Sequence, residues 1–65
     1  MSQTHAILAH LERGHTITPV EALNKYGSFR LAARIAELRE KGHPVQSAIV
    51  RRGDKRFARY WLAPR

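Results

Sequence analysis

Four basic side chains stand close together near the end of the chain, at Arg51, Arg52, Lys55 and Arg56, with Gly53 between them. Clustered guanidinium and ammonium groups bind phosphate oxygens well, because they donate charge-assisted hydrogen bonds to them. The chemistry that this spacing favours is therefore the neutralisation of a polyanion. A solubilising loop that protects a sheet edge is compatible with this role, but it would not need so many arginines.

The positive charge is concentrated at one end of the chain. The whole chain of 65 residues has a formal net charge of +7. Residues 1–29 are neutral, residues 30–50 carry +2, and residues 51–65 carry +5, because six basic side chains there face only Asp54. Such clustering is typical of proteins that bind nucleic acid.

The spacing of the four histidines in the sequence does not indicate a metal site or a catalytic site. No two of them have the spacing of ligands on one helix face, and the chain has no cysteine, so a structural zinc is not expected. No order of serine, histidine and aspartate, no glycine-rich phosphate loop and no carboxylate pair indicates catalysis. We therefore expect no enzyme, no cofactor and no metal.

The length of 65 residues indicates one small domain, spanning residues 1–65. Without cysteine there is no disulfide, so packing, helix caps or a partner must stabilise it. Apolar runs reach only about four or five residues, far below the ~20 that cross a membrane. No signal peptide is visible. We expect a cytoplasmic protein without a membrane partner.

A first helix is predicted over residues 3–13, because apolar residues recur there at helical spacing from Ile7 to Leu11. His10 is expected to face away from this apolar side. Gly14 follows at the place where a residue in the left-handed conformation ends a helix.

The second predicted helix has the sharpest start signal in the sequence. Thr18 at the N-cap, Pro19 at the first helical position and Glu21 at the third form a capping box. The helix is expected over residues 19–26 and must be short, because Gly27 breaks it.

A third helix is predicted over residues 28–41, with Ser28 as its N-cap and Gly42 at its end. Its buried stripe follows i, i+4 and i+7 spacing, at Leu31, Ile35 and Leu38. The second and third helices are joined by about three residues that include a glycine, which is the arrangement of a helix-turn-helix.

Two β-strands are predicted after the helices, over residues 45–51 and 56–62, with the basic cluster at the hairpin tip between them. An isolated hairpin is marginally stable in water, so it must pack against the helices. The expected fold is mostly α with a small β-hairpin. Three helices followed by a two-stranded wing are the order of a winged helix-turn-helix domain.

From about Leu11 to Leu62 the sequence resembles a family of small winged helix-turn-helix domains from phages and prophages. The residues that carry the resemblance are Ile17-Thr18-Pro19, Glu21-Ala22-Leu23, Tyr26-Gly27, Arg30-Leu31-Ala32-Ala33-Arg34-Ile35, Leu38-Arg39, Gly42-His43, Ala58-Arg59-Tyr60 and Leu62. The resemblance implies a DNA-binding role inside a bacterial host cell.

The N-terminal half of a recognition helix faces base edges in the major groove. There an arginine fork binds guanine, and an alanine allows close approach and meets a thymine methyl. The residues expected to contact DNA from the third helix are Ser28, Arg30, Ala33, Arg34 and Glu37. Those expected from the wing are Arg51, Arg52, Lys55 and Arg56. For Arg34 and Glu37, an ordinary surface ion pair three residues apart remains open.

Alternation alone does not decide which face of residues 57–62 is buried. The resemblance implies that Tyr60 and Leu62 point inward, which puts Phe57 and Trp61 on the other face. For Trp61, packing into the core is favoured over an outer position, where it would contact a partner protein or cover the first helix.

We predict sequence-specific binding of double-stranded DNA by the third helix and the basic wing, in a phage or prophage transcriptional regulator or an excisionase-like architectural factor. One small domain reads few bases, so self-association or cooperative binding on DNA is expected. The alternative is a protein-binding module, such as a phage inhibitor of a host protein, that uses the aromatic strand face. RNA binding is less favoured, because no aromatic platform for unstacked bases is evident.

Overall fold

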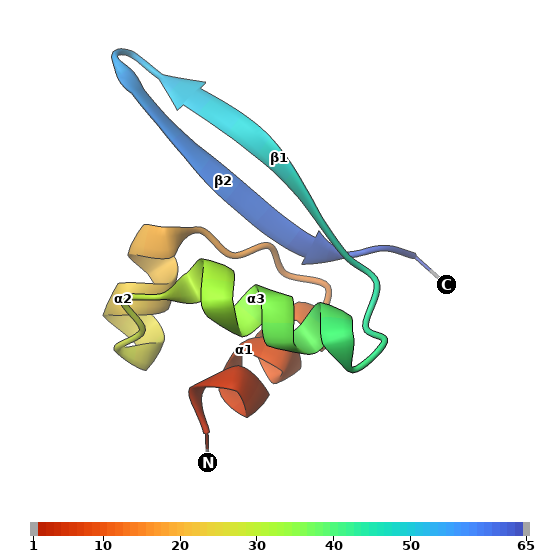
Figure 1. The fold of residues 1–65 in the computed structure, drawn as a ribbon. Coiled ribbons are helices and arrows are strands. Elements are labelled where there is room, and N and C mark those ends of the chain that lie inside the picture. Colours follow the sequence, from red (N-terminus) through yellow and green to blue (C-terminus); the bar gives the residue numbers. More distant parts are fainter. Residues whose placement is uncertain (1, 65) are drawn as a thin grey trace.

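The structure is a computed structural model that describes residues 2–64. Three helices precede a two-stranded antiparallel hairpin (Figure 1). The elements are α1 (Gln3–Glu12), α2 (Pro19–Tyr26), α3 (Leu31–Glu40), β1 (Val45–Arg52) and β2 (Lys55–Leu62). This order confirms the predicted fold class. No helix among residues 2–64 is long and apolar enough to cross a membrane.

The start of α2 is capped by Thr18 as predicted, whereas the Glu21 carboxylate contacts the Thr18 hydroxyl and not the Thr18 backbone N–H of a complete capping box. The Thr18 hydroxyl accepts from the backbone N–H of Glu21 over 3.3 Å and donates to the Glu21 carboxylate over 3.3 Å. Gly27 ends the helix in the left-handed conformation, with φ of +66°, and its N–H donates to the carbonyl of Leu23. Glycine adopts this conformation without steric cost, so α2 stops after two turns and the chain can reverse.

Helix α3 begins at Leu31, three residues later than predicted, and Ser28 is not its N-cap. Arg30 holds the N-cap position without a side-chain cap hydrogen bond. The backbone N–H of Ser28 instead donates to the carbonyl of Ala22 and so helps to close α2. Because Ser28 completes the end of one helix, two further residues are needed before the next helix can start.

The hydrophobic core lies between the helices and the base of the hairpin. Its buried members are Ile7, Leu11, Ile17, Ala22, Leu31, Ile35, Leu38 and Val45, against which Leu8, Tyr26, Tyr60 and Leu62 pack. The predicted stripe of α3 is therefore confirmed. Ile17 also pairs with Tyr60 in a single antiparallel bridge, in which each N–H donates to the other residue's carbonyl over 2.9 Å. This bridge ties the connector before α2 to the sheet.

His10 is buried, which corrects the expectation that it faces away from the core. Only 5% of the residue is exposed. Its Nδ1 lies 2.9 Å from the Tyr26 hydroxyl and its Nε2 lies 2.8 Å from the carbonyl oxygen of Thr16. Because a carbonyl oxygen only accepts, Nε2 carries a proton and donates it. The ring can be buried because both of its nitrogens are satisfied, and it joins α1 to α2.

The register of the hairpin decides which strand face is buried. Val45 pairs with Leu62, and Gln46 pairs with Trp61. Successive side chains alternate between the two faces of a strand, so Leu62 faces the core and Trp61 faces away from it. Trp61 is half-buried and lies outside the core cluster, so the expectation that it packs into the core is wrong.

Candidate nucleic-acid interface

The hairpin tip carries its four basic side chains in two like-charged pairs. Arg51 stands opposite Arg56, and Arg52 stands opposite Lys55. All four residues are exposed. Like charges placed directly across an antiparallel pair destabilise it. This arrangement works against the stability of the hairpin, and a polyanion would relieve the repulsion.

The tip presents positive charge on both faces of the hairpin. Alternation puts Arg51 and Arg56 on the face of the core residues, and Arg52 and Lys55 on the opposite face. A tight turn at Gly53, with φ of +57°, joins the strands and brings the four side chains together. The strands are each one residue longer toward the tip than predicted, so all four cations belong to paired strand positions.

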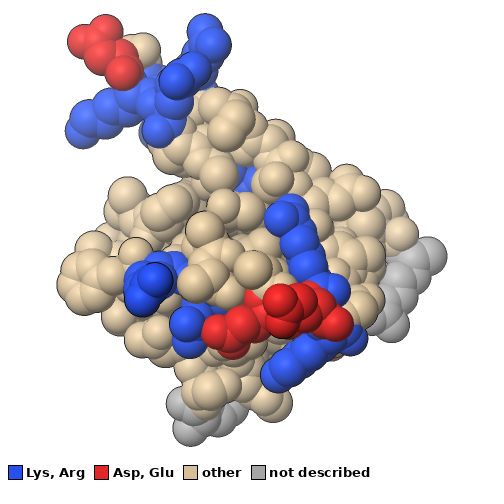
Figure 2. Space-filling model, viewed as in Figure 1, with Lys and Arg blue, Asp and Glu red and all other residues tan. Residues whose placement is uncertain are grey.

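The basic tip projects from the helical body. Figure 1 shows the hairpin leaving the helices toward its tip, and Figure 2 shows basic side chains gathered there beside acidic atoms. In the same view, further basic side chains lie on the helical body, next to an acidic patch. Basic groups of the tip and of the body are therefore both visible from one side. Arg65, which belongs to the C-terminal charge excess, lies outside the described residues.

The residues predicted to contact DNA from the third helix differ in how exposed they are to solvent. Arg30 is exposed at the N-cap of α3, and Ala33 is half-buried in its first turn. Ser28 is buried, at 2% exposure, and its hydroxyl oxygen finds no hydrogen-bond partner among the described residues. Arg30 is thus the predicted helix residue that is most free to approach a ligand.

Arg34 and Glu37 are held together against α1. Arg34 Nη2 lies 3.1 Å from Glu37 Oε1, with side chains 30% and 40% exposed. The other carboxylate oxygen of Glu37 accepts a 2.7 Å hydrogen bond from the hydroxyl of Thr4, which is buried. The ion pair that the spacing left open is therefore formed, and both side chains already have protein partners.

Phe29 is an exposed aromatic residue that the sequence analysis did not single out. It lies in the turn between α2 and α3, and its residue surface is 85% exposed. The sequence contains a signal for this, because Phe29 is apolar but falls outside the helical stripe that includes Leu31 and Ile35. An apolar residue outside the buried stripe faces water or a partner.

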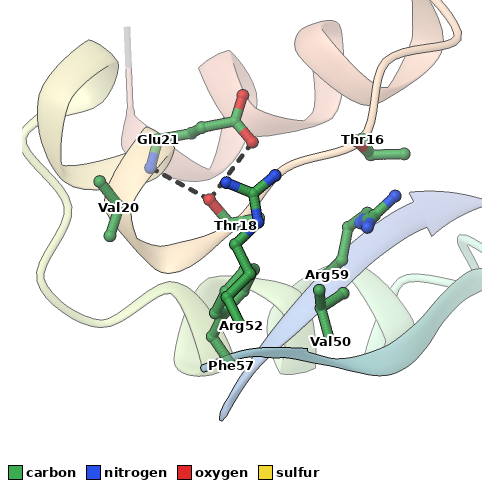
Figure 3. Close-up of a pocket in the computed structure, with 8 residues that line it drawn as sticks. All are labelled: Thr16, Thr18, Val20, Glu21, Val50, Arg52, Phe57 and Arg59. Carbon is green, nitrogen blue, oxygen red and sulfur yellow. Dashed lines mark hydrogen bonds between the residues drawn. The ribbon is translucent and has the colours of Figure 1, made fainter. Parts of the chain in front are cut away.

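A groove separates the start of α2 from the outer face of the hairpin (Figure 3). Its volume is about 490 Å³, and it is lined by residues that include Thr18, Glu21, Arg52, Phe57 and Arg59. In Figure 3 the Arg52 side chain extends from the hairpin toward Thr18 and Glu21 on the opposite wall. The groove thus combines guanidinium groups with apolar and aromatic surface.

Comparison with known families identifies one match. A family model described as a winged helix-turn-helix domain matches residues 2–65. No curated protein and no solved structure matches the chain. The matched range includes all three helices and both strands, so it contains the whole candidate interface.

Proposed function

The chain belongs to the family of winged helix-turn-helix domains, and on this basis we propose that it binds double-stranded DNA sequence-specifically through α3 and the hairpin. The observation that carries the proposal is the pairing of like charges at the exposed hairpin tip. A protein gains no stability from such pairs. They become favourable when phosphate groups surround them.

Helix α3 would read the bases from its N-terminal end. The major groove is about 12 Å wide and admits a helix, whose first residues then face the base edges. Arg30 stands at this end and its side chain is free to bind a guanine, while Ala33 leaves room for close approach. Arg34 would have to leave Glu37 to reach a base, so we assign the main reading role to Arg30.

The hairpin would act as the wing and bind phosphates. Four tip cations make about four phosphate contacts, so the logarithm of the affinity should fall with the logarithm of the salt concentration with a slope of about −4. These contacts carry no sequence information, so they add affinity for every duplex. The wing would therefore set how tightly the protein binds, and α3 would set where.

The biological role we propose is that of a phage or prophage transcriptional regulator, or of an excisionase-like architectural factor. The molecule measures 34 × 26 × 20 Å, and one turn of duplex is about 34 Å long. One copy thus reaches one turn at most. A site that is unique in a genome would need cooperative binding or self-association of copies.

The experiment that tests the proposal is selection of bound duplexes from a random pool, followed by gel shift of the selected site over about 50 to 200 mM salt. We expect a consensus sequence and a steep loss of affinity with salt. A palindrome would indicate a two-fold dimer, and a direct repeat would indicate copies bound head to tail. The absence of any bound duplex at the lowest salt would contradict the proposal.

A second candidate function is a protein-binding module that uses the outer face of the hairpin. The observation that favours it is that Phe57 and Trp61 are only half-buried there, and that Trp61 lines a hollow of about 520 Å³ together with residues that include Val50 and Arg59. Under this alternative the protein would ignore duplex DNA at about 150 mM salt, where phosphate contacts still act. Trp61→Ala would then abolish partner binding. If the protein binds DNA, the same variant should leave DNA affinity unchanged.

A further inference from the structure

Phe29 is held on the surface by its neighbours on both sides. It is the most exposed of the large hydrophobic residues that the structure describes, at 85%, whereas Ser28 and Leu31 are exposed by only 2% and 3%. The chain is therefore anchored in the body before and after Phe29. The exposed position of its ring is therefore part of the fold of this turn.

The backbone that follows Phe29 is also fixed. The carbonyl oxygen of Arg30 accepts from the N–H groups of Ala33 and Arg34, at 3.1 and 3.2 Å, and so starts α3. Consecutive Cα atoms are about 3.8 Å apart. Any approach of the start of α3 to DNA therefore brings the backbone of Phe29 close to the same place, and the exposed side chain of Phe29 lies next to the base that Arg30 would read.

The groove that admits α3 decides what the ring can contact. A helix with its side chains is about 10–12 Å wide and fits the major groove, but not the minor groove of about 6 Å. Apolar wedges that enter between bases act from the minor groove. In the major groove the apolar group that a base pair offers is the C5-methyl group of thymine.

We propose that Phe29 is a specificity-determining residue that contacts a thymine C5-methyl group next to the base read by Arg30. This inference rests on the proposed DNA-binding function and names a base feature that the interface reads. This apolar contact between Phe29 and the methyl group involves no hydrogen bond and no phosphate contact. Phe29 therefore acts on sequence preference and leaves the salt dependence unchanged.

The test replaces single thymines of the selected duplex with uracil, which keeps the pairing and hydrogen-bonding edges and lacks only the methyl group. With the wild-type protein, one thymine position should lose about fourfold in affinity, the equivalent of ~0.8 kcal/mol for one apolar carbon. Phe29→Ala should bind thymine and uracil equally at that position. Phe29→Leu should retain part of the difference.

A matched control is Val20→Ala, which removes another exposed apolar side chain, 65% exposed, from α2. It should keep the fourfold preference for thymine. Thermal melting followed by circular dichroism checks that both alanine variants fold, as their surface positions predict.

Three results would overturn the inference while leaving the proposed function intact. The first is that uracil replaces every thymine without loss of affinity. The second is that Phe29→Ala keeps the thymine preference. The third is that Phe29→Ala weakens binding of the thymine and uracil duplexes equally, as the loss of a stacking contact would. A wild-type protein that binds no duplex would overturn both. Failure to bind any duplex can be distinguished from the other three results, because those three are measured on DNA that the protein binds.

Discussion

The hydroxyl of Thr4 on α1 donates a 2.7 Å hydrogen bond to the carboxylate of Glu37 on α3. The same carboxylate pairs with Arg34 one helical turn earlier. Thr4 is buried and the Glu37 side chain is partly exposed, so this bond is partly shielded from water and links α3 to α1. A surface ion pair alone contributes little. The contact with Thr4 is what makes this cluster part of the framework that carries the proposed reading helix.

Thr4→Val should destabilise the protein, because it keeps the shape of the side chain but leaves Glu37 Oε2 without the hydroxyl that donates to it. The free energy of unfolding should fall by about 1 kcal/mol, measured by urea denaturation. Thr16→Val is the matched control, since Thr16 is exposed and uses its backbone carbonyl in the contact with His10. Equal losses in the two variants would show that the hydroxyl of Thr4 contributes nothing.

Arg30→Ala should relax the sequence preference more than Arg34→Ala does. Arg30 is exposed at the start of α3, whereas Arg34 is paired with Glu37. Loss of one base contact costs about 1–3 kcal/mol of discrimination. Competition gel shifts at fixed salt, with the selected site against a scrambled site, measure this directly. If neither variant changes the ratio, α3 does not read the bases.

The two faces of the hairpin tip can be compared with two double variants. Arg51→Ala with Arg56→Ala clears one face, and Arg52→Ala with Lys55→Ala clears the other. Each should weaken binding to all sequences and flatten the salt slope by about 2, provided that both faces contact phosphates. Neither should lower the melting temperature, because each removes a like-charged pair. A change in slope for only one pair would mean that the wing lies with one face on the DNA.

Ile35→Ala should unfold the domain. Ile35 is 1% exposed in the core, and truncation of such a residue costs about 2–5 kcal/mol. A domain of this size has roughly 3–5 kcal/mol of net stability. Ile49→Ala is the control, because Ile49 is 66% exposed on the hairpin. Circular dichroism at room temperature should show lost helix for the first variant and a native spectrum for the second.

Local patterns in the sequence were sufficient to predict the order of the helices and strands and the position of the basic residues at the hairpin tip. The capping box at Thr18, the stripe of Leu31, Ile35 and Leu38, and the basic hairpin tip all depend on residues within a few positions of one another. Spacing of this kind determines which side chains share a helix face or a strand face. For that reason the element order was predicted correctly.

The tertiary structure decided which residues pack against each face of the helices and strands. His10 is buried because the Tyr26 hydroxyl, 16 residues away in the chain, and the carbonyl of Thr16, which follows the end of α1, satisfy its ring nitrogens. Ser28 closes α2 through Ala22, which delays α3 and leaves Phe29 in the turn. A periodic pattern names two possible faces, but the free energy of burying either one depends on the partners that the complete fold brings to it.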